Sequence, residues 1–427
     1  MKKKTLNFQE KILMFIKKTK PSSARQALIL TPIIIAVLAF AGWMERSQAI
    51  ENPKLAQNND DELTLTMVGD IMMGRHIKEI TDRYGEDFVF RNVKGFFEKS
   101  DYVSGNYEHP VIMGQEESYE KLEKNIHLSS TEQDLQTVKD AGFDVLSLAN
   151  NHTMDFGSKG IEDTMQAFKQ NKVEYVGAGN NIDEAKEAIS YKEVDGVRIA
   201  TVGFNDTLVP GMKADENRPG VLSADPDLIF EVIQKAKENA DLIVVNAHWG
   251  QEYDVEPSPR QEGLAKAMVD AGADVIVGHH PHVVQSFDVY NGAVIFYSLG
   301  NFVFDQGWSN TKNSAMVQYH LNKQGEATVD VIPMQIKEGS PQPTESKWKQ
   351  NRIYRDLTKY SSNEARLEKE GDKFQLKLDH EHVIERAKER KQKEEQQKTN
   401  NDAKQGQSST SEAPVNNTEE AYPENAQ

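Results

Sequence analysis

Short runs of β-branched and other apolar residues alternate with amphipathic helical patterns between residues 63 and 337. Such runs are typical of strands, and helical patterns between them are typical of crossovers that connect strands of one sheet. The predicted strands are 63–68, 102–105, 145–149, 173–177, 197–204, 242–247, 275–277, 315–321 and 327–334, and the predicted helices are 131–141, 158–171, 226–237 and 259–271. This alternation predicts an α/β domain over residues 63–337.

Two predicted hairpins interrupt the alternation. Asp195-Gly196 and Asn291-Gly292 each lie between β-type segments. Asp-Gly and Asn-Gly favour two-residue turns, because both residue types tolerate a positive φ. Antiparallel pairs should therefore join the parallel strands, so we expect mixed sheets.

The N-terminal part predicts a membrane anchor. Residues 27–44 are uncharged and largely apolar, and a helix of 18 residues at about 1.5 Å each nearly spans a hydrocarbon core of about 30 Å. Residues 1–26 hold eight cations against one anion, and Lys and Arg favour the cytoplasmic side. We therefore expect a basic cytoplasmic leader (1–26) and a single-pass anchor in the cell membrane (27–44), with the main domain extracytoplasmic.

A cleaved signal peptide is the alternative, because Ser47-Gln48-Ala49 resembles a small-x-small cleavage site. The apolar run and the basic leader are both long for a signal peptide, which favours the uncleaved anchor. The polar, aperiodic residues 45–62 then predict a linker between the membrane and the domain.

The pattern weakens after the last predicted strand. Residues 338–400 form a charged extension, of which 381–400 could be a solvated helix. Residues 401–427 are rich in Asn, Gln, Ser, Glu and Pro, so they bury too little apolar surface to order themselves. This segment predicts a disordered tail.

Composition excludes several classes of site. The chain has no cysteine, which excludes disulfides, thiolate metal sites and cysteine nucleophiles. The leader's charge of +7, taken from the net charge of −17, leaves −24 on the remaining residues. Such a charge repels polyanions, so we expect no nucleic-acid binding.

Residues that bind hard or borderline metal ions follow five of the predicted strands. They are Asp70 after 63–68, Glu108 after 102–105, Asn150, Asn151 and His152 after 145–149, His248 after 242–247, and His279, His280 and His282 after 275–277. Ligands bind beyond the carboxyl ends of strands in open α/β sheets, so these residues should converge on one cleft. Mixed carboxylate, amide and imidazole ligands suit one or two divalent Mn, Zn, Fe or Mg ions.

Each residue alone has an ordinary explanation. Gly69-Asp70 is a common turn, Glu108 could be a solvated carboxylate, and His248 could simply pack beside Trp249. Three imidazoles within Gly-His-His-Pro-His are harder to explain by packing. The five segments together therefore predict a metal site.

The order of these motifs resembles that of calcineurin-like metallophosphoesterases. The resemblance is closer to the bacterial poly-gamma-glutamate capsule-biosynthesis protein A family, described as the accessory subunit of poly-gamma-glutamate synthase. The motifs that carry it are GDIMMGR (69–75), GNYEHP (105–110), LANNHTMDFG (148–157), HWGQEY (248–253), VGHHPHVVQ (277–285) and FYSLGNFVFDQ (296–306). It implies a metallophosphoesterase-like α/β/β/α sandwich of mixed sheets, preceded by one transmembrane helix.

The resemblance also implies a role for each site residue. Asp70 would bind the first metal, Asn151 and His248 would bind the second, and the Glu108 carboxylate would bridge the two. His280 and His282 would supply the paired imidazoles, with His279 as an alternative ligand. His152 would be the general acid or an orienting group. One departure stands out: phosphoesterases have Asp-x-His where this chain has Asp70-Ile71-Met72. Ordinary phosphoesterase activity is therefore in doubt unless a group such as His76 substitutes.

Two further polar positions border the predicted cleft. Arg75 could clamp a substrate carboxylate or phosphate, or form a surface salt bridge. Asn301, in the run that begins at Ser298, is expected to be a polar contact in the cleft wall, whereas no motif places Ser298 beside a base.

Three functions remain open. The first is a component of poly-gamma-glutamate synthesis and export that works with other membrane subunits. No phosphate-binding Gly-x-x-x-x-Gly-Lys-Ser/Thr loop is present, so ATP-dependent ligation is expected in a partner subunit. The alternatives are an extracellular metal-dependent hydrolase of phosphoester or amide bonds, and a metal-stabilised binding module without turnover.

Overall fold

The computed structural model describes residues 62–307, 310–362 and 366–408, together with scattered positions between 11 and 39. The chain divides into two units, Met1–Leu55 and Ala56–Gln427, and the following concerns the second. Among the described residues, no helix has both the length and the apolar character needed to cross a membrane. The predicted anchor (27–44) lies partly outside the described residues, and the predicted cleavage site, most of the linker and residues 409–427 lie wholly outside them.

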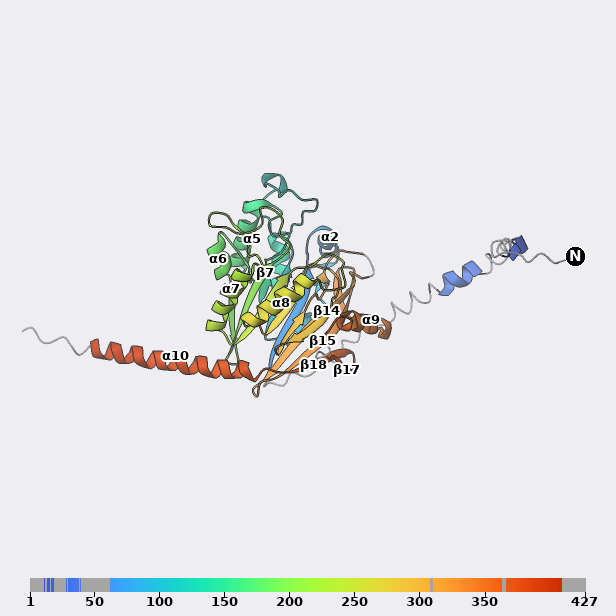
Figure 1. Ribbon diagram of the computed structural model, residues 1–427. Coiled ribbons are helices and arrows are strands. Elements are labelled where there is room, and N and C mark those ends of the chain that lie inside the picture. Colours follow the sequence, from blue (N-terminus) through green and yellow to red (C-terminus); the bar gives the residue numbers. More distant parts are fainter. Residues whose placement is uncertain are drawn as a thin grey trace, which may run out of the picture. The chain divides into compact units, whose positions relative to one another are not determined.

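A ten-stranded mixed sheet contains the first and the last strands of the domain (Figure 1). Its strands are β1 (Glu62–Ile71), β2 (Tyr102–Tyr107), β3 (Val145–Ser147), β4 (Glu174–Val176), β13 (Asn301–Val303), β14 (Asn313–Asn322), β15 (Glu326–Lys337), β16 (Ser340–Pro343), β17 (Glu368–Glu370) and β18 (Lys373–Asp379). The order is β17-β18-β15-β14-β1-β2-β3-β4, with β13 beside β1 and β16 beside β15. Strands β1 to β4 are parallel, whereas β14, β15, β17 and β18 continue the sheet in antiparallel pairs.

A second, six-stranded sheet has the order β11-β12-β10-β9-β7-β6. Its strands are β6 (Ser190–Val194), β7 (Val197–Asn205), β9 (Leu242–His248), β10 (Val275–His279), β11 (Phe287–Tyr290) and β12 (Ala293–Phe296). The four central strands are parallel. The antiparallel pairs β6–β7 and β11–β12 turn at Asp195-Gly196 and Asn291-Gly292, which confirms both predicted hairpins.

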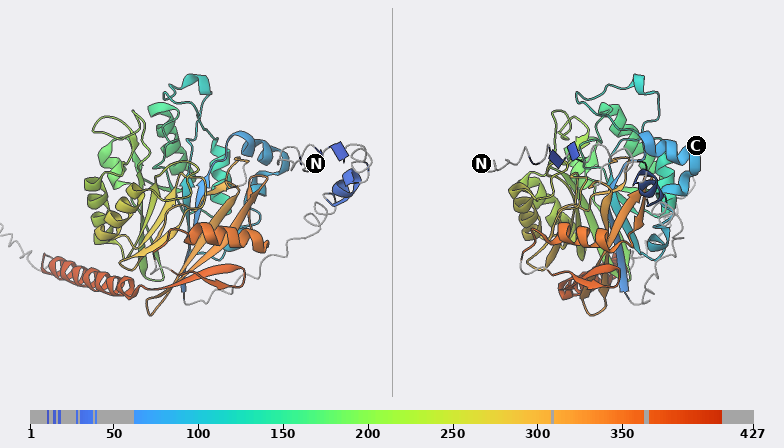
Figure 2. Two further views of the ribbon diagram at one scale, coloured as in Figure 1. Left: turned by 45° about the vertical axis from the view of Figure 1, so that its right-hand side comes forward. Right: turned by 90° about the vertical axis from the view of Figure 1, so that its right-hand side faces the viewer.

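Helices surround the two sheets (Figure 2). They are α2 (Arg75–Tyr84), α3 (Lys94–Phe97), α4 (Glu132–Ala141), α5 (Gly157–Asn171), α6 (Ile182–Glu187), α7 (Pro226–Asn239), α8 (Pro259–Ala271), α9 (Lys347–Thr358) and α10 (Glu381–Ser408), with 3-10 turns η1 (Glu86–Val89) and η2 (Glu116–Ser118) and a small sheet of β5 (Ala178–Gly179) and β8 (Gly220–Val221). The start of α8 follows from its sequence: Ser258 caps it reciprocally with Gln261, and Pro259 stands where no backbone donor is needed. All four predicted helices are confirmed to within two residues at each end.

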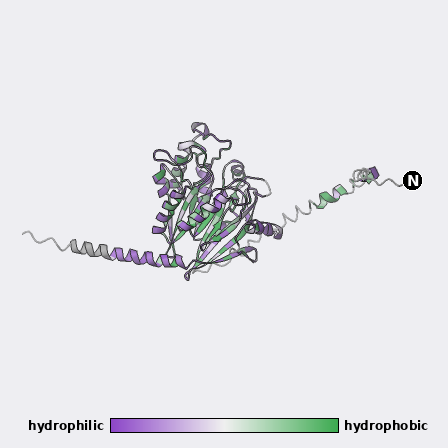
Figure 3. Cartoon of the chain, viewed as in Figure 1, coloured by the Kyte–Doolittle hydropathy of each residue, from purple (hydrophilic) through white to green (hydrophobic). Residues whose placement is uncertain are grey.

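Apolar side chains hold these layers together. One buried cluster joins residues of both sheets, including Met67 and Val317 from the first and Val244 and Val277 from the second. A second cluster lies between the six-stranded sheet and α7 and α8, as Ile233 and other residues show. The chain is therefore an α/β fold with two mixed sheets, and Figure 3 shows the apolar strands inside it.

The first sheet continues past residue 337. Strand β18 pairs with β15 along six residues, and it buries Phe374 and Leu376 while its intervening side chains are more exposed. Helix α9 packs Ile353 and Leu357 into the same core. Helix α10 buries Val383 and Ala387 near its start and is largely exposed from there to residue 399. It ends at Ser408, within the segment predicted to be the tail.

Candidate metal centre

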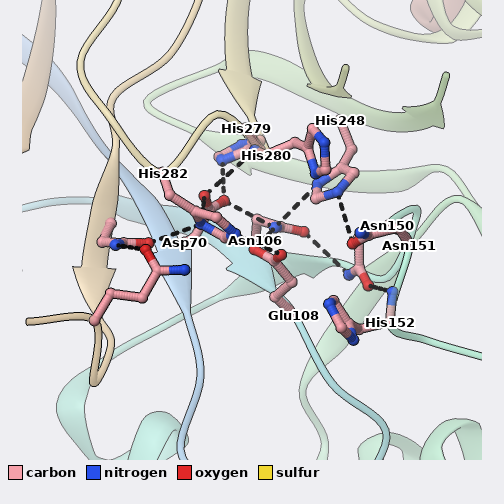
Figure 4. Close-up of polar contacts among 12 residues, drawn as sticks. Asp70, Asn106, Glu108, Asn150, Asn151, His152, His248, His279, His280 and His282 are labelled. Carbon is pink, nitrogen blue, oxygen red and sulfur yellow. Dashed lines mark hydrogen bonds and ion pairs between the residues drawn. The ribbon is translucent and has the colours of Figure 1, made fainter. Parts of the chain in front are cut away.

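The carboxyl ends of five strands bring the predicted ligands together (Figure 4). The residues that converge there are Asp70 from β1, Asn106 and Glu108 from β2 and the residues after it, Asn150, Asn151 and His152 after β3, His248 from β9, and His279, His280 and His282 from β10 and the loop after it. The parallel strands β1 to β3 end at one edge of the first sheet, β9 and β10 end at one edge of the second, and β1 contacts β10, so residues distant in sequence meet.

Two overlapping groups of side chains offer ligand atoms that lie within 4.8 Å of one another. The first consists of Asp70, Glu108 and His282, and the second consists of Glu108, His248 and His280. All five side chains are buried. Because Glu108 belongs to both groups, the arrangement can hold one ion in either group, or two ions that share a carboxylate.

Glu108 is a buried carboxylate with one oxygen that makes no hydrogen bond. Its Oε1 atom is buried and makes no hydrogen bond, while its Oε2 atom accepts one from the Asn106 amide at 3.2 Å. Burial, and then the nearby Asp70 carboxylate, raise the pKa of Glu108 well above its ordinary value. A buried carboxylate with an open lone pair is costly without a cation, so this residue fits a metal ion.

Asp70 is held on several sides. Burial acts to raise its pKa, but contacts with His279 and His282 hold that pKa well below the ordinary value. Each imidazole places its Nδ1 atom 3.3 Å from an Asp70 oxygen. The neighbouring Gly69 permits this position, because a Cβ there would lie 1.8 Å from the Gly300 carbonyl oxygen.

His279 lies behind Asp70. Its Nε2 atom lies 3.0 Å from the Asn246 side-chain oxygen, and its Nδ1 atom faces Asp70. It belongs to neither candidate ligand group. Of the two ways to align Gly-His-x-His, the geometry therefore favours His280 and His282 as the ligands.

Burial favours the neutral form of the two imidazoles in the second group. Burial, and then the neighbouring His280, lower the pKa of His248 well below its ordinary value. Burial, followed by His282, lowers the pKa of His280 to about 3, and the buried Nδ1 atom of His280 has no hydrogen-bond partner. A neutral imidazole is the form that binds metal. His248 Nε2 also lies 3.0 Å from the Asn151 side-chain oxygen, which places a fourth donor beside this group.

The loop after β10 has an unusual backbone. His280 and His282 have φ angles of 93° and 57°, a region that residues other than glycine rarely adopt. Such conformations concentrate at functional sites. The Asn301 side-chain oxygen, 2.9 Å from His282 Nδ1, fixes one of these rings and confirms that Asn301 makes a polar contact in the wall.

His152 forms a buried pair with a residue that the sequence did not single out. Its Nδ1 atom lies 2.7 Å from Asp155 Oδ2, and Lys124 Nζ donates to Asp155 Oδ1 at 2.7 Å and to the Asn151 backbone oxygen at 2.7 Å. Burial lowers the pKa of His152, although Asp155 opposes that effect. Asp155 was recognisable only as the acid three residues after His152, and Lys124 carried no sequence signal.

Asn106 is the other functional residue that was not predicted as a ligand. Its amide nitrogen donates to Asp70 at 2.9 Å and to Glu108, while its oxygen accepts from Asn150 at 3.1 Å. Asn150 in turn accepts from the backbone of His152, so it orders the loop. Asn106 therefore links the two carboxylates to the loop after β3.

Two predicted residues lie outside the cluster. Arg75 forms an ion pair with Asp305 at the rim, with 40% of its side chain exposed. The His76 side chain is 60% exposed and contacts Glu79, so it does not replace the imidazole missing at Met72. Met72 itself is buried.

Comparison with known proteins identifies relatives of this chain. Residues 64–306 match the family described as bacterial capsule synthesis protein PGA_cap. The chain is 56% identical to the capsule biosynthesis protein CapA of Bacillus anthracis over 91% of this chain and 95% of that protein. It is 46% identical to the PGA biosynthesis protein CapA of Bacillus subtilis (strain 168), over 88% of this chain and 98% of that protein.

A solved structure has a distant likeness. It is the calcineurin-like phosphoesterase YfkN from Bacillus subtilis, at 14% identity and a TM-score of 0.40, over 78% of this chain and 97% of that one. The family match and the two relatives extend over the strands and loops that form the cluster. The chain belongs to the bacterial capsule synthesis protein PGA_cap family.

Proposed function

We propose that this chain is a membrane-anchored, extracytoplasmic component of poly-gamma-glutamate capsule synthesis and export, and that its cluster holds one or two divalent metal ions. Two relatives are named for this process, one as a capsule biosynthesis protein and the other as a PGA biosynthesis protein, and their similarity supports it. The basic leader and the uncharged run at 27–44 support the anchor.

One observation supports the metal site most strongly: the two buried ligand groups share Glu108, whose Oε1 atom makes no hydrogen bond. Carboxylate, amide and imidazole donors together suit Mn, Zn, Fe or Mg. Asp70 and His282 would hold one ion with Glu108. His248, His280 and the Asn151 oxygen would hold the other.

The remaining polar residues suit chemistry or binding beside that centre. A bound divalent ion would supply Lewis-acid polarisation and an activated water. His152 can hold or donate a proton at Nε2, because Asp155 faces its Nδ1 atom. Arg75, on the rim, could leave its ion pair with Asp305 and pair with an anionic group of a substrate.

The assembly reaction itself belongs to a partner. No phosphate-binding Gly-x-x-x-x-Gly-Lys-Ser/Thr loop occurs in the sequence, so a separate ATP-dependent subunit would form the polymer bonds. Other membrane subunits of a synthase and export complex are thus the expected partners, with the polymer as the shared ligand.

A second candidate is an extracellular metal-dependent hydrolase. The buried His152–Asp155 pair favours it, since a scaffold has no need for an oriented proton donor. Met72, in place of the phosphoesterase imidazole, makes an amide bond a better candidate substrate than a phosphoester.

The experiment compares the full-length chain with its Asp70→Ala and His280→Ala variants in a capsule-forming host that lacks its own copy. We expect about one or two divalent ions per wild-type chain, fewer in each variant, and loss of polymer in both. His76→Ala is the matched control, because that imidazole is exposed and outside the cluster. Normal polymer in metal-free variants would overturn a function that depends on the metal and leave a scaffold role.

A further inference from the structure

Positive charge is concentrated on helix α9 and the residue after it. Residues 347–359 hold five cations and one anion. The chain beyond the leader carries −24, so this segment is an exception to its surroundings. A basic segment on an otherwise acidic domain indicates a local binding site for an anion.

Three of these cations lie on one face of the helix. Arg352, Arg355 and Lys359 are spaced by three and four residues, which places them side by side, while Ile353 and Leu357 face the core. The three cations line a surface pocket of about 340 Å³. We call this the α9 pocket.

The charges of the α9 pocket are incompletely balanced. Among the described residues, Asp356 is the one carboxylate that lines the pocket; its oxygens lie 3.5 Å from Arg355 and 4.0 Å from Arg352 Nε. That Nε atom is buried and makes no hydrogen bond, although the Arg352 guanidinium also donates to Asn310. Lys359 donates to the Tyr360 hydroxyl at 2.6 Å, and Glu256 acts on it through space. A carboxylate from a ligand would therefore balance positive charge in this pocket that Asp356 does not balance.

The α9 pocket is joined to the metal centre by shared segments. Val255 lines the pocket, and two residues before it the Tyr253 ring centroid lies 6.1 Å from that of His282. Asn310 also lines the pocket, and the next residue, Thr311, accepts from the Asn301 amide that orients His282. Two short segments, 253–255 and 310–311, therefore connect the pocket with the surroundings of the candidate metal centre.

We propose that the α9 pocket binds the side-chain carboxylates of poly-gamma-glutamate and holds one stretch of the polymer while another lies at the metal centre. The inference rests on the proposed function for the identity of the polymer. Arg guanidinium groups bind carboxylates in a two-pronged geometry, and seven residues of helix spread the three cations over about 10 Å. That spread suits repeated carboxylates better than a single small anion.

The test measures binding of fluorescently labelled poly-gamma-glutamate to the purified full-length chain by anisotropy. Arg355→Ala/Lys359→Ala and the reversal Arg355→Glu remove charge from exposed positions, so they should leave the fold intact. We expect each to weaken binding at least about tenfold, since one charge-assisted hydrogen bond is worth about that factor. Binding of the wild-type chain should weaken as salt is added.

Lys347→Ala is the matched control. It removes one cation from the same helix, outside the pocket, where Lys347 pairs with Asp372. We expect it to bind polymer like the wild-type chain. Equal binding by the pocket variants, or no binding by the wild-type chain, would overturn the assignment. If the wild-type chain binds phosphatidylglycerol vesicles more strongly than the polymer, and the vesicles displace the polymer, the pocket is a lipid headgroup site and the assignment is overturned.

The outcome is separable from that of the proposed function. The pocket variants should keep the wild-type metal content, because none of their residues belongs to the ligand groups. If they bind polymer normally while Asp70→Ala still abolishes polymer production, the pocket assignment fails and the proposed function stands. If Asp70→Ala makes normal polymer, the proposed function fails, and the binding measurement still decides the pocket.

Discussion

Asp155 and His152 form a buried pair in which a carboxylate oxygen lies 2.7 Å from the imidazole Nδ1 atom, and Lys124 holds the other oxygen of the same carboxylate. Neither Asp155 nor Lys124 belongs to a candidate ligand group. The pair therefore fixes the ring that faces the cluster without itself being a candidate metal ligand.

Asp155→Asn should separate orientation from metal binding. An amide has one acceptor oxygen where the carboxylate has two, so the variant can no longer accept from Lys124 at one oxygen and from the ring at the other, and His152 loses its fixed orientation. We expect wild-type metal content and polymer yield or hydrolysis lowered by about 10-fold to 100-fold, as for partners that orient functional residues. Elemental analysis and a polymer assay on the same preparation would measure both, and an unchanged yield would rule out a role for the pair.

Glu108→Gln should affect both ion positions at once. The amide keeps the size of the side chain but removes the charge that both ligand groups share. We expect metal content below that of Asp70→Ala, in which only one group loses a ligand. A titration of both variants with Mn²⁺ and Zn²⁺ would test this, and wild-type affinity in Glu108→Gln would mean that Glu108 does not bridge.

Arg390→Ala should loosen helix α10. Arg390 donates to both oxygens of Asp241 at 2.9 to 3.2 Å, and Asp241 is 1% exposed. Removing the guanidinium leaves a buried carboxylate with a backbone partner only, so we expect a loss of about 3 kcal/mol in the free energy of unfolding. Denaturant unfolding would measure it.

Lys388→Ala is the control for that measurement, because Lys388 is an exposed cation on the same helix. We expect a change within about 0.5 kcal/mol. Equal effects of the two substitutions would show that α10 contributes through its helicity and charge, and not through the Arg390–Asp241 contact.

His380 should make stability depend on pH. Burial lowers its pKa, although a hydrogen bond from its Nε2 atom to the Gly292 oxygen at 3.0 Å opposes this; its Nδ1 atom accepts from the Tyr319 hydroxyl at 2.7 Å. Three charged or titratable groups also act on it: Asp274, His382 and Arg386. Because the folded pKa is depressed, this contribution is present above the unfolded value of about 6.5 and is lost as pH falls below it.

The measurement compares the wild-type chain with His380→Gln between pH 7.5 and 5. Subtracting the two unfolding free energies removes the contributions of the other buried histidines. We expect the difference to shrink as pH falls, because only the wild-type chain carries an imidazole at position 380 that binds a proton more readily in the unfolded chain than in the folded one. A difference that is constant with pH would contradict a neutral His380.

The sequence predicted the parts of the fold whose signal is local. Asn291-Gly292 predicted its hairpin because two residues determine that turn. The runs of 242–247 and 275–277 predicted strands because they are continuously apolar, and both strands are buried and parallel in the structure. Strand β18 was missed because charged residues flank its two buried side chains, Phe374 and Leu376, and only pairing with β15 makes it a strand.

The residues of the candidate site also differ in how far the sequence predicts them. Asp70 and His280 follow strongly predicted strands, so their meeting could be expected from topology. Lys124 lies in a loop without periodicity, and its contact with Asp155 depends on how that loop folds over the cluster. Asn106 has no comparable signal, because an amide beside a carboxylate is the weaker candidate ligand, yet its hydrogen bonds connect the two carboxylates.

The central claim is that the buried carboxylates and imidazoles around Glu108 hold a divalent metal ion. An anomalous difference map from crystals of the chain grown with Zn²⁺ or Mn²⁺ tests it most directly. We predict a peak about 2.0 to 2.2 Å from a Glu108 oxygen and from the nitrogen of at least one of His248, His280 and His282. Well-ordered side chains with no peak among them, at a metal concentration that saturates the chain in solution, would contradict it.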